Sequence, residues 1–199
     1  GSGTPMGRSM KPGSPSTSFG SNASSFVSDA TASGTATASF SSCGSWDAGP
    51  GGNDELKTTV MMRNLPNDYT REMLFKLLDQ EGFNGCYDLV YLPIDYHSKV
   101  GFGYAFINLV SHDEAERFRA HFTDFSNWEV VSQKVCEVCW SSVLQGVQAH
   151  VDRYRNSPVM HEAVRDEFKP VLFENGKRVP FPGPTKSIRA PRARRRDSK

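Results

Sequence analysis

The most informative stretch of this chain is the octet Phe102-Gly103-Tyr104-Ala105-Phe106-Ile107-Asn108-Leu109, residues 102–109. Side chains alternate between the two faces of a strand, so Tyr104, Phe106 and Asn108 share one face. The aliphatic side chains between them point to the other face, where they suit packing against helices. The octet therefore predicts a strand with one apolar face and one face that carries two flat rings beside an amide.

The sequence around this strand predicts a β-α-β-β-α-β order. Thr70 and Ser111 are placed to cap two helices, and Ser111 begins the capping-box pattern S-x-x-E. The predicted strands are 58–63, 87–93, 102–109 and 134–140. The predicted helices are 70–81 and a second one that opens at Ser111 and carries Ala115, Phe118 and Phe122 at helical spacing. This order is typical of the α+β ferredoxin-like sandwich, a four-stranded antiparallel sheet with both helices on one face and the other face open.

Downstream of this unit the pattern predicts an extension of the domain. Leu144, Val147, Val151 and Tyr154 recur at helical spacing and predict a third helix. Farther on, two short apolar runs flank Asn-Gly, which suits a two-residue hairpin turn because both central positions need positive φ. The predicted organisation is a disordered Ser/Gly/Thr-rich segment at 1–56, a domain at 57–141, a helical and hairpin extension at 142–183 and a basic disordered tail at 184–199.

Charge is divided unevenly along the chain, although the net charge is only +1. Residues 57–143 carry a net charge of −4, and residues 186–199 carry +6. The arginines of the tail either attract phosphates or form a nuclear localisation signal, and a solvated terminus without a specific role is the alternative. They are Arg189, Arg192, Arg194, Arg195 and Arg196, followed by Lys199.

Several classes of protein are disfavoured by the same sequence. No apolar stretch approaches the ~20 residues that a membrane-spanning helix needs. Cys136-x-x-Cys139 has no second pair, and its odd spacing on a strand puts the two sulfurs on opposite faces, so we expect no metal. No nucleophile–base pair or cofactor motif indicates an enzyme. Four cysteines without a secretory signal favour an intracellular protein, in the nucleus, the cytoplasm or both.

A face of two aromatic rings and an amide fits single-stranded RNA. Stacking an exposed base on an aromatic ring contributes roughly 1–3 kcal/mol, and Asn108 is placed to hydrogen-bond a base edge. Residues 102–109 resemble the RNP1 signature of RNA recognition motifs, and residues 60–65 resemble RNP2. Two positions depart from these signatures, because Phe102 stands where a basic residue is usual and Met61 where an aromatic ring is usual.

Several separate blocks narrow the resemblance to one family. The blocks are residues 58–67, 87–95, 103–108, 134–138, 169–173 and 180–182. They are similar to the C-terminal RNA recognition motif of the Mei-two-like proteins, which include a fungal regulator of meiosis and the plant terminal ear-like proteins. The resemblance implies an RNA-binding module whose extension belongs to the fold, and it brings an association with meiotic, developmental and post-transcriptional control.

The expected RNA-binding residues gather on the open face and its surroundings. They are Tyr104, Phe106, Asn108, Met61, Arg63, Trp140 and Lys99. Trp140 has two interpretations, since it either stacks a base or wedges the third helix. The polar Asp88 prefers water, which predicts that Tyr87 and Tyr91 point toward the helices.

The leading hypothesis is a non-enzymatic protein that binds single-stranded RNA, without a cofactor or a membrane. The alternative is a protein-protein interaction module that kept the fold and lost RNA binding, with partners on the sheet face or the extension. Met61, Phe102 and the acidic domain favour that alternative. The position of the third helix decides between an open platform and a covered one.

Overall fold

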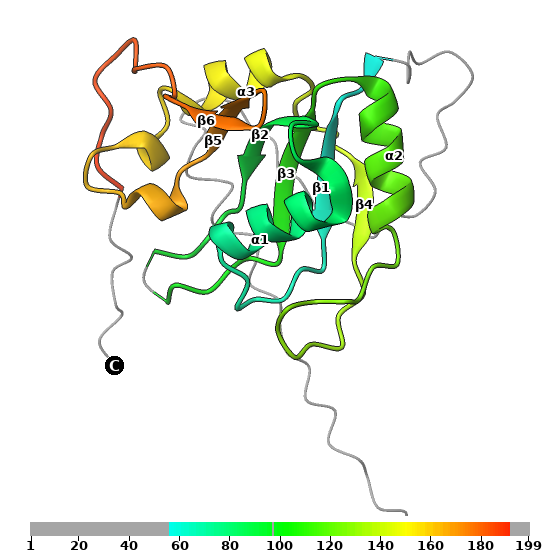
Figure 1. Cartoon of the computed structure of the whole chain (residues 1–199). Coiled ribbons are helices and arrows are strands. Elements are labelled where there is room, and N and C mark those ends of the chain that lie inside the picture. Colours follow the sequence, from blue (N-terminus) through cyan, green and yellow to red (C-terminus); the bar gives the residue numbers. More distant parts are fainter. Residues whose placement is uncertain (1–55, 97, 192–199) are drawn as a thin grey trace, which may run out of the picture. The chain divides into compact units, whose positions relative to one another are not determined.

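The computed structural model describes residues 56–96 and 98–191, and the predicted segment 1–56 and the tail from 192 onward lie almost wholly outside this range. Six antiparallel strands form one sheet in the order β4-β1-β3-β2-β5-β6 (Figure 1). The strands are β1 Thr59–Arg63, β2 Tyr87–Tyr91, β3 Tyr104–Leu109, β4 Glu137–Trp140, β5 Val171–Glu174 and β6 Lys177–Val179. The helices are α1 Arg71–Leu78, α2 His112–Phe122 and α3 Val147–Tyr154.

The first four strands and two helices confirm the predicted α+β ferredoxin-like fold. The Thr70 hydroxyl accepts a hydrogen bond from the Met73 N–H, and Ser111 does the same for Glu114, so both predicted caps form. Helix α1 ends earlier than predicted, at Leu78, and a π-helical turn follows at Asp79–Phe83.

The hairpin extends the same sheet instead of standing apart from it. Strand β5 pairs with β2, and β6 pairs with β5, so the four-stranded sheet becomes six-stranded. Asn175 and Gly176 have φ values of 50° and 74°, as the predicted turn requires. A Cβ on Gly176 would lie 2.8 Å from Asn84 Oδ1, which adds a steric reason for glycine here.

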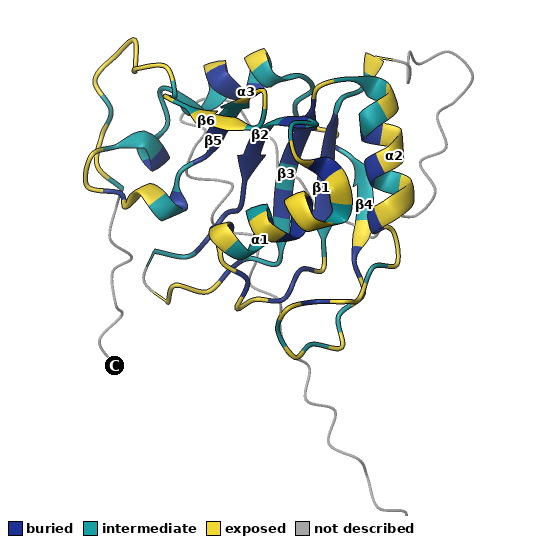
Figure 2. Cartoon of the chain, in the orientation of Figure 1, coloured by how far each residue is buried: buried dark blue, intermediate teal, exposed yellow. Residues whose placement is uncertain are grey.

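The main core lies between α1, α2 and one face of the sheet (Figure 2). The aliphatic side chains of β3 point into it, which confirms the predicted alternation of that strand. Its members include Val60, Met62, Leu74, Leu78, Val90, Ala105, Ile107, Leu109, Phe118 and Phe122. Helix α3 packs on the opposite face through a second cluster that contains Val151 and Leu89.

The prediction for Tyr91 is wrong because strand β2 contains a register irregularity. The pairing with β3 shifts between Tyr87 and Leu89. Tyr87 therefore points toward α1, as predicted, while Tyr91 lies opposite Phe106 on the other face. Tyr91 is buried, but its ring packs against Tyr154 of α3, with the centroids 4.8 Å apart. A bulge of this kind reverses which side chains share a face.

A polar clamp holds the segment after α3 to the core. The buried Arg71 guanidinium donates to the Asp166 carboxylate at 2.8 Å, and Arg178 donates to the same carboxylate. These hydrogen bonds, from Arg178 above all, hold the pKa of Asp166 well below its usual range. The clamp joins α1 to β6 across Asp166.

Two absences apply to the described part of the chain. None of its helices has the length and apolar character needed to cross a membrane. It contains no cluster of three or more His, Cys, Asp or Glu side chains that would hold a metal ion. Cys136 is buried on the core side, where burial raises the pKa of its thiol to about 12, and Cys139 lies on the other face.

Candidate nucleic-acid interface

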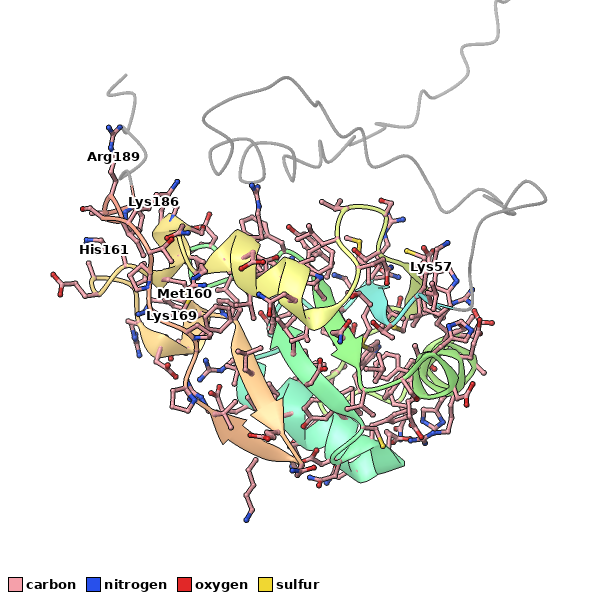
Figure 3. The ribbon with its side chains drawn as sticks, turned by 90° about the horizontal axis from the view of Figure 1, so that it is seen from above. Lys57, Met160, His161, Lys169, Lys186 and Arg189 are labelled. Atoms are coloured by element: carbon pink, nitrogen blue, oxygen red, sulfur yellow. The ribbon has the colours of Figure 1, made fainter. Side chains whose placement is uncertain are left out.

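Helix α3 lies across part of the sheet face that the sequence predicts to be open. Figure 3 shows α3 on one side of the sheet and α1 and α2 on the other. The His150 ring lies 6.0 Å from the Phe106 ring, and Tyr154 covers Tyr91. Helix α3 therefore occupies the half of the face formed by β2 and the middle of β3.

The segment that leads into α3 is fixed to the beginning of β1. Gln145 Oε1 accepts hydrogen bonds from the backbone N–H groups of Thr58 and Thr59, and its Nε2 donates to the Thr59 carbonyl. The Gly146 N–H donates to the Thr59 hydroxyl at 2.9 Å. Gly146 has φ of 83°, which lets the chain turn into the helix. These hydrogen bonds fix the position of the N-terminal end of α3 relative to β1.

Asn108 lies on the predicted face, but its amide is engaged within the protein. It is almost fully buried, at 2% exposure. Its Oδ1 accepts from the hydroxyls of Thr58 and Thr59, and its Nδ2 donates to the Asp88 carboxylate and to the Leu109 carbonyl. These four bonds use every donor and acceptor of the amide. Asn108 therefore orders the sheet, and a base edge would meet no free polar atom on it.

His150 is the polar side chain that α3 brings to the sheet. Its ring is 1% exposed, and neither ring nitrogen has a hydrogen-bond partner in the described structure. Burial lowers the pKa of His150 to about 4, although the nearby Leu144 carbonyl offsets part of the effect. The imidazole is therefore neutral between the rings of Phe106 and Tyr154.

The other end of the face carries the remaining candidate residues. We call Phe102, Tyr104, Arg63 and Glu137 the sheet-end platform. Arg63 lies directly opposite both Tyr104 on β3 and Glu137 on β4, so these three side chains form a row across three strands. The rings of Phe102 and Tyr104 lie 6.4 Å apart at an angle of 28°. Partial burial raises the pKa of the Tyr104 hydroxyl, which keeps it protonated.

Phe106 and Met61 link this platform to the part covered by α3. The Phe106 ring contacts Tyr104 edge to face, with centroids 5.7 Å apart. Met61 lies opposite Phe106 on the same face and is 7% exposed. Phe106 therefore packs against the platform residue Tyr104, and Met61 packs beside Phe106. We assign both side chains a supporting role.

Two charged residues, Lys134 beside the platform and Glu137 within it, were not among the candidates from the sequence. Lys134 Nζ donates to the Leu65 carbonyl at 2.8 Å and to the Asn67 side chain, and it lies 3.6 Å from the position of a Cβ on Gly103. It brings a positive charge close to the octet, where Phe102 replaces the usual basic residue. Glu137 begins β4 and is exposed. Alternation along β4 could have placed Glu137 on the same face as the platform. No local sequence pattern indicated that Lys134 lies near it.

Trp140 does not share the platform's face. It pairs with Val60, whose side chain lies in the core between the sheet and the helices. Its ring stacks on His112 of α2 at 5.5 Å, and the Arg119 guanidinium lies 4.5 Å from the ring centroid. The expectation that Trp140 stacks a base or wedges α3 is therefore corrected, because the strand register turns it toward α2.

The remaining predicted residues lie apart from the platform or outside the described range. Lys99 is in the loop between β2 and β3, with its ammonium 5.4 Å from the Phe168 ring centroid. Lys186 and Arg189 project on the side of the sheet that α3 covers (Figure 3). The predicted tail arginines Arg192, Arg194, Arg195 and Arg196 lie outside the described residues.

Comparisons with known proteins agree with this architecture. Residues 57–155 match the family described as RNA recognition motif 2. The chain is 38% identical over 151 residues to protein MEI2-like 4 of Oryza sativa subsp. japonica, covering 73% of this chain and 14% of that protein. It is 33% identical over 141 residues to meiosis protein mei2 of Schizosaccharomyces pombe, covering 68% and 18%. The chain thus spans less than a fifth of the length of either relative.

A further relative and a solved structure complete these comparisons. Protein terminal ear1 of Zea mays is 35% identical over 155 residues, covering 69% of this chain and 23% of that protein. The solved structure titled "Structure of RNA15 RRM" aligns with a TM-score of 0.37 at 17% identity, covering 44% of this chain and 92% of that one.

Proposed function

Because this chain belongs, through residues 57–155, to the RNA recognition motif 2 family, we propose that it binds single-stranded RNA on the sheet-end platform. The observation that carries the proposal is the pair of partly exposed rings of Phe102 and Tyr104, beside the row of charged residues at the start of β3. Tyr104 and Phe102 supply stacking surfaces, and Arg63 and Lys134 supply positive charge. The protein acts without enzymatic chemistry.

Helix α3 covers part of the sheet face and thereby limits the length of the RNA-binding site. Phe106 packs against His150 and Tyr91 against Tyr154, so bases stack there only if α3 moves away. Asn108 serves to hold β1, β2 and β3 in register instead of contacting RNA. We therefore expect a short site of a few nucleotides, with phosphate attraction added by the basic tail beyond Lys186.

The cellular part of the proposal follows the relatives. The relative in Schizosaccharomyces pombe is named meiosis protein mei2, and the plant relatives are named MEI2-like 4 and terminal ear1. By this likeness we propose a role in post-transcriptional regulation, within the nucleus or the cytoplasm.

Substitution of Tyr104 tests the proposal. We expect Tyr104→Ala to weaken binding of a labelled single-stranded RNA by about 5- to 100-fold, the loss of one stacking interaction. Tyr104→Phe keeps the ring and serves as the matched control, with affinity near that of the wild type. Fluorescence anisotropy gives the affinity, and thermal unfolding verifies that each variant folds. Unchanged affinity in a folded Tyr104→Ala protein would refute binding at the platform.

A protein-interaction module is the second candidate, and two observations favour it. Helix α3 fills half of the face where RNA would stack, and Glu137 adds negative charge to the other half. Salt dependence separates the two functions, because RNA binding weakens steeply with salt and contact with a peptide does not.

A further inference from the structure

Glu137 is the one acidic side chain of the sheet-end platform. Its neighbours Val138 and Trp140 pair with the core residues Met62 and Val60, so strand alternation places Glu137 on the opposite face with Cys139. Glu137 is exposed, and within the described residues it takes part in no ion pair. Its carboxylate is therefore available to a ligand.

The backbone separation between Tyr104 and Glu137 leaves room for a base over β1. Tyr104, Arg63 and Glu137 occupy directly opposite positions on β3, β1 and β4. Neighbouring strands lie about 4.8 Å apart, so the backbones of Tyr104 and Glu137 are separated by roughly 10 Å. A base stacked on Tyr104 and extending over β1 directs one edge toward Arg63 and Glu137.

The chemistry of that edge follows from the two charged groups. A carboxylate repels phosphate and only accepts hydrogen bonds, whereas a guanidinium only donates them. Guanine presents two adjacent donors, N1–H and the N2 amino group, next to the O6 acceptor. Adenine and cytosine present one amino donor beside a ring acceptor, and uracil presents one N–H between two carbonyls. Only guanine offers two adjacent donors for the two carboxylate oxygens of Glu137 and an acceptor beside them for the guanidinium of Arg63.

We propose that Glu137, with Arg63 next to it, makes the platform selective for guanine in single-stranded RNA. Glu137 accepts from N1–H and the N2 amino group, and Arg63 donates to O6. The carboxylate that opposes general attraction of RNA thereby becomes the group that reads a base. This inference rests on the proposed function, because it requires a base stacked on Tyr104.

Oligonucleotides that differ at one position test the selectivity. The probes are labelled UUUGUUU, UUUAUUU, UUUCUUU and UUUUUUU, titrated into the full chain. We expect UUUGUUU to bind about tenfold more tightly than the others. Replacing guanine by inosine removes only the N2 amino group, so we expect it to lose part of that preference.

Variants assign the selectivity to Glu137. Glu137→Gln keeps the size of the side chain but replaces one acceptor with a donor. We expect its preference for guanine to fall below about threefold while its affinity for UUUUUUU stays the same or rises. The matched control is Glu162→Gln, an exposed glutamate in the segment after α3, which should keep the full preference.

Each outcome has a distinct meaning. A guanine preference that persists in Glu137→Gln overturns the inference, as does equal binding of all four oligonucleotides. Equal binding that is lost in Tyr104→Ala overturns the inference alone and leaves the proposed function standing. No binding of any oligonucleotide overturns both.

Discussion

Replacing His150 with leucine should strengthen the docking of α3 and remove an acid sensitivity of the protein. His150 is buried against Phe106, and its two nitrogens lack hydrogen-bond partners in the described structure. Leucine fills a similar volume, is a better helix former and carries no polar atom to desolvate. At pH 7.5 we expect His150→Leu to be more stable than the wild type by about 1 kcal/mol, the cost of one poorly satisfied buried polar group.

The pH dependence gives the larger signal. Burial lowers the pKa of His150 to about 4 from its ordinary value of 6.5. Above pH 6.5 the imidazole is neutral whether the protein is folded or not, so stability does not change there. Between pH 6.5 and pH 4 the unfolded chain takes up a proton that the folded protein does not, and stability falls as the pH falls. The loss amounts to about 2 kcal/mol at pH 5.

Nearby titratable groups do not obscure this window. Burial raises the pKa of Tyr91 and of Tyr154, so both stay neutral throughout it. Carboxylates elsewhere titrate equally in wild type and variant, so the difference between the two proteins isolates His150.

Urea unfolding at pH 7.5, 6.0 and 5.0 measures the effect. The stability advantage of His150→Leu should grow from about 1 kcal/mol at pH 7.5 to about 3 kcal/mol at pH 5. Hydrogen exchange of the α3 amides should show the same trend if α3 undocks before the rest of the domain. His161→Gln, in the segment after α3, is the control and should run parallel to the wild type. An advantage that stays constant with pH would refute a buried neutral His150.

Three further predictions concern the parts that frame the site. Asn108→Ala should destabilise the domain by about 3 kcal/mol in urea unfolding, because it leaves the buried partners of the amide unsatisfied; a loss below about 1 kcal/mol would show that water replaces them. Asp166→Asn should cost about 1 kcal/mol, since it weakens the clamp on the buried Arg71 while solvent screens the exposed carboxylate. With the pKa of Asp166 lowered, the wild-type contribution persists above that group's ordinary pKa and fades as the pH falls below it; melting temperatures of the two proteins should therefore converge in acid and stay apart near neutrality. Removal of residues 186–199 should lower both the RNA affinity and the salt slope measured by anisotropy, and an unchanged slope would show that the tail does not contact phosphates.

Local patterns predicted the elements of this fold well. The caps at Thr70 and Ser111 depend on residues three positions apart, and the hairpin turn depends on Asn175 and Gly176 alone. The alternation of β3 was visible within its own octet, and so was the face that Tyr104 shares with Phe106.

Predictions that depended on distant pairing were less secure. Alternation along β4 separates Trp140 from Glu137, but only the register of Trp140 with Val60 shows which of the two faces meets α1 and α2. Tyr91 changed face because a bulge lies before it. The apolar stripe of α3 indicated that one side is buried but did not indicate against what.

The β-α-β-β-α-β order, the hairpin and the aromatic strand can be predicted from the sequence, because each is encoded by neighbours along the chain. Which of those aromatic residues remain at the surface depends on tertiary packing. Gln145 anchors α3 through the backbone of Thr59, 86 positions away, and Asn108 bonds to Thr59 across 49 positions. Contacts over such separations form when the sheet assembles, so the covered half of its face and the platform beside it follow from packing and not from any local pattern.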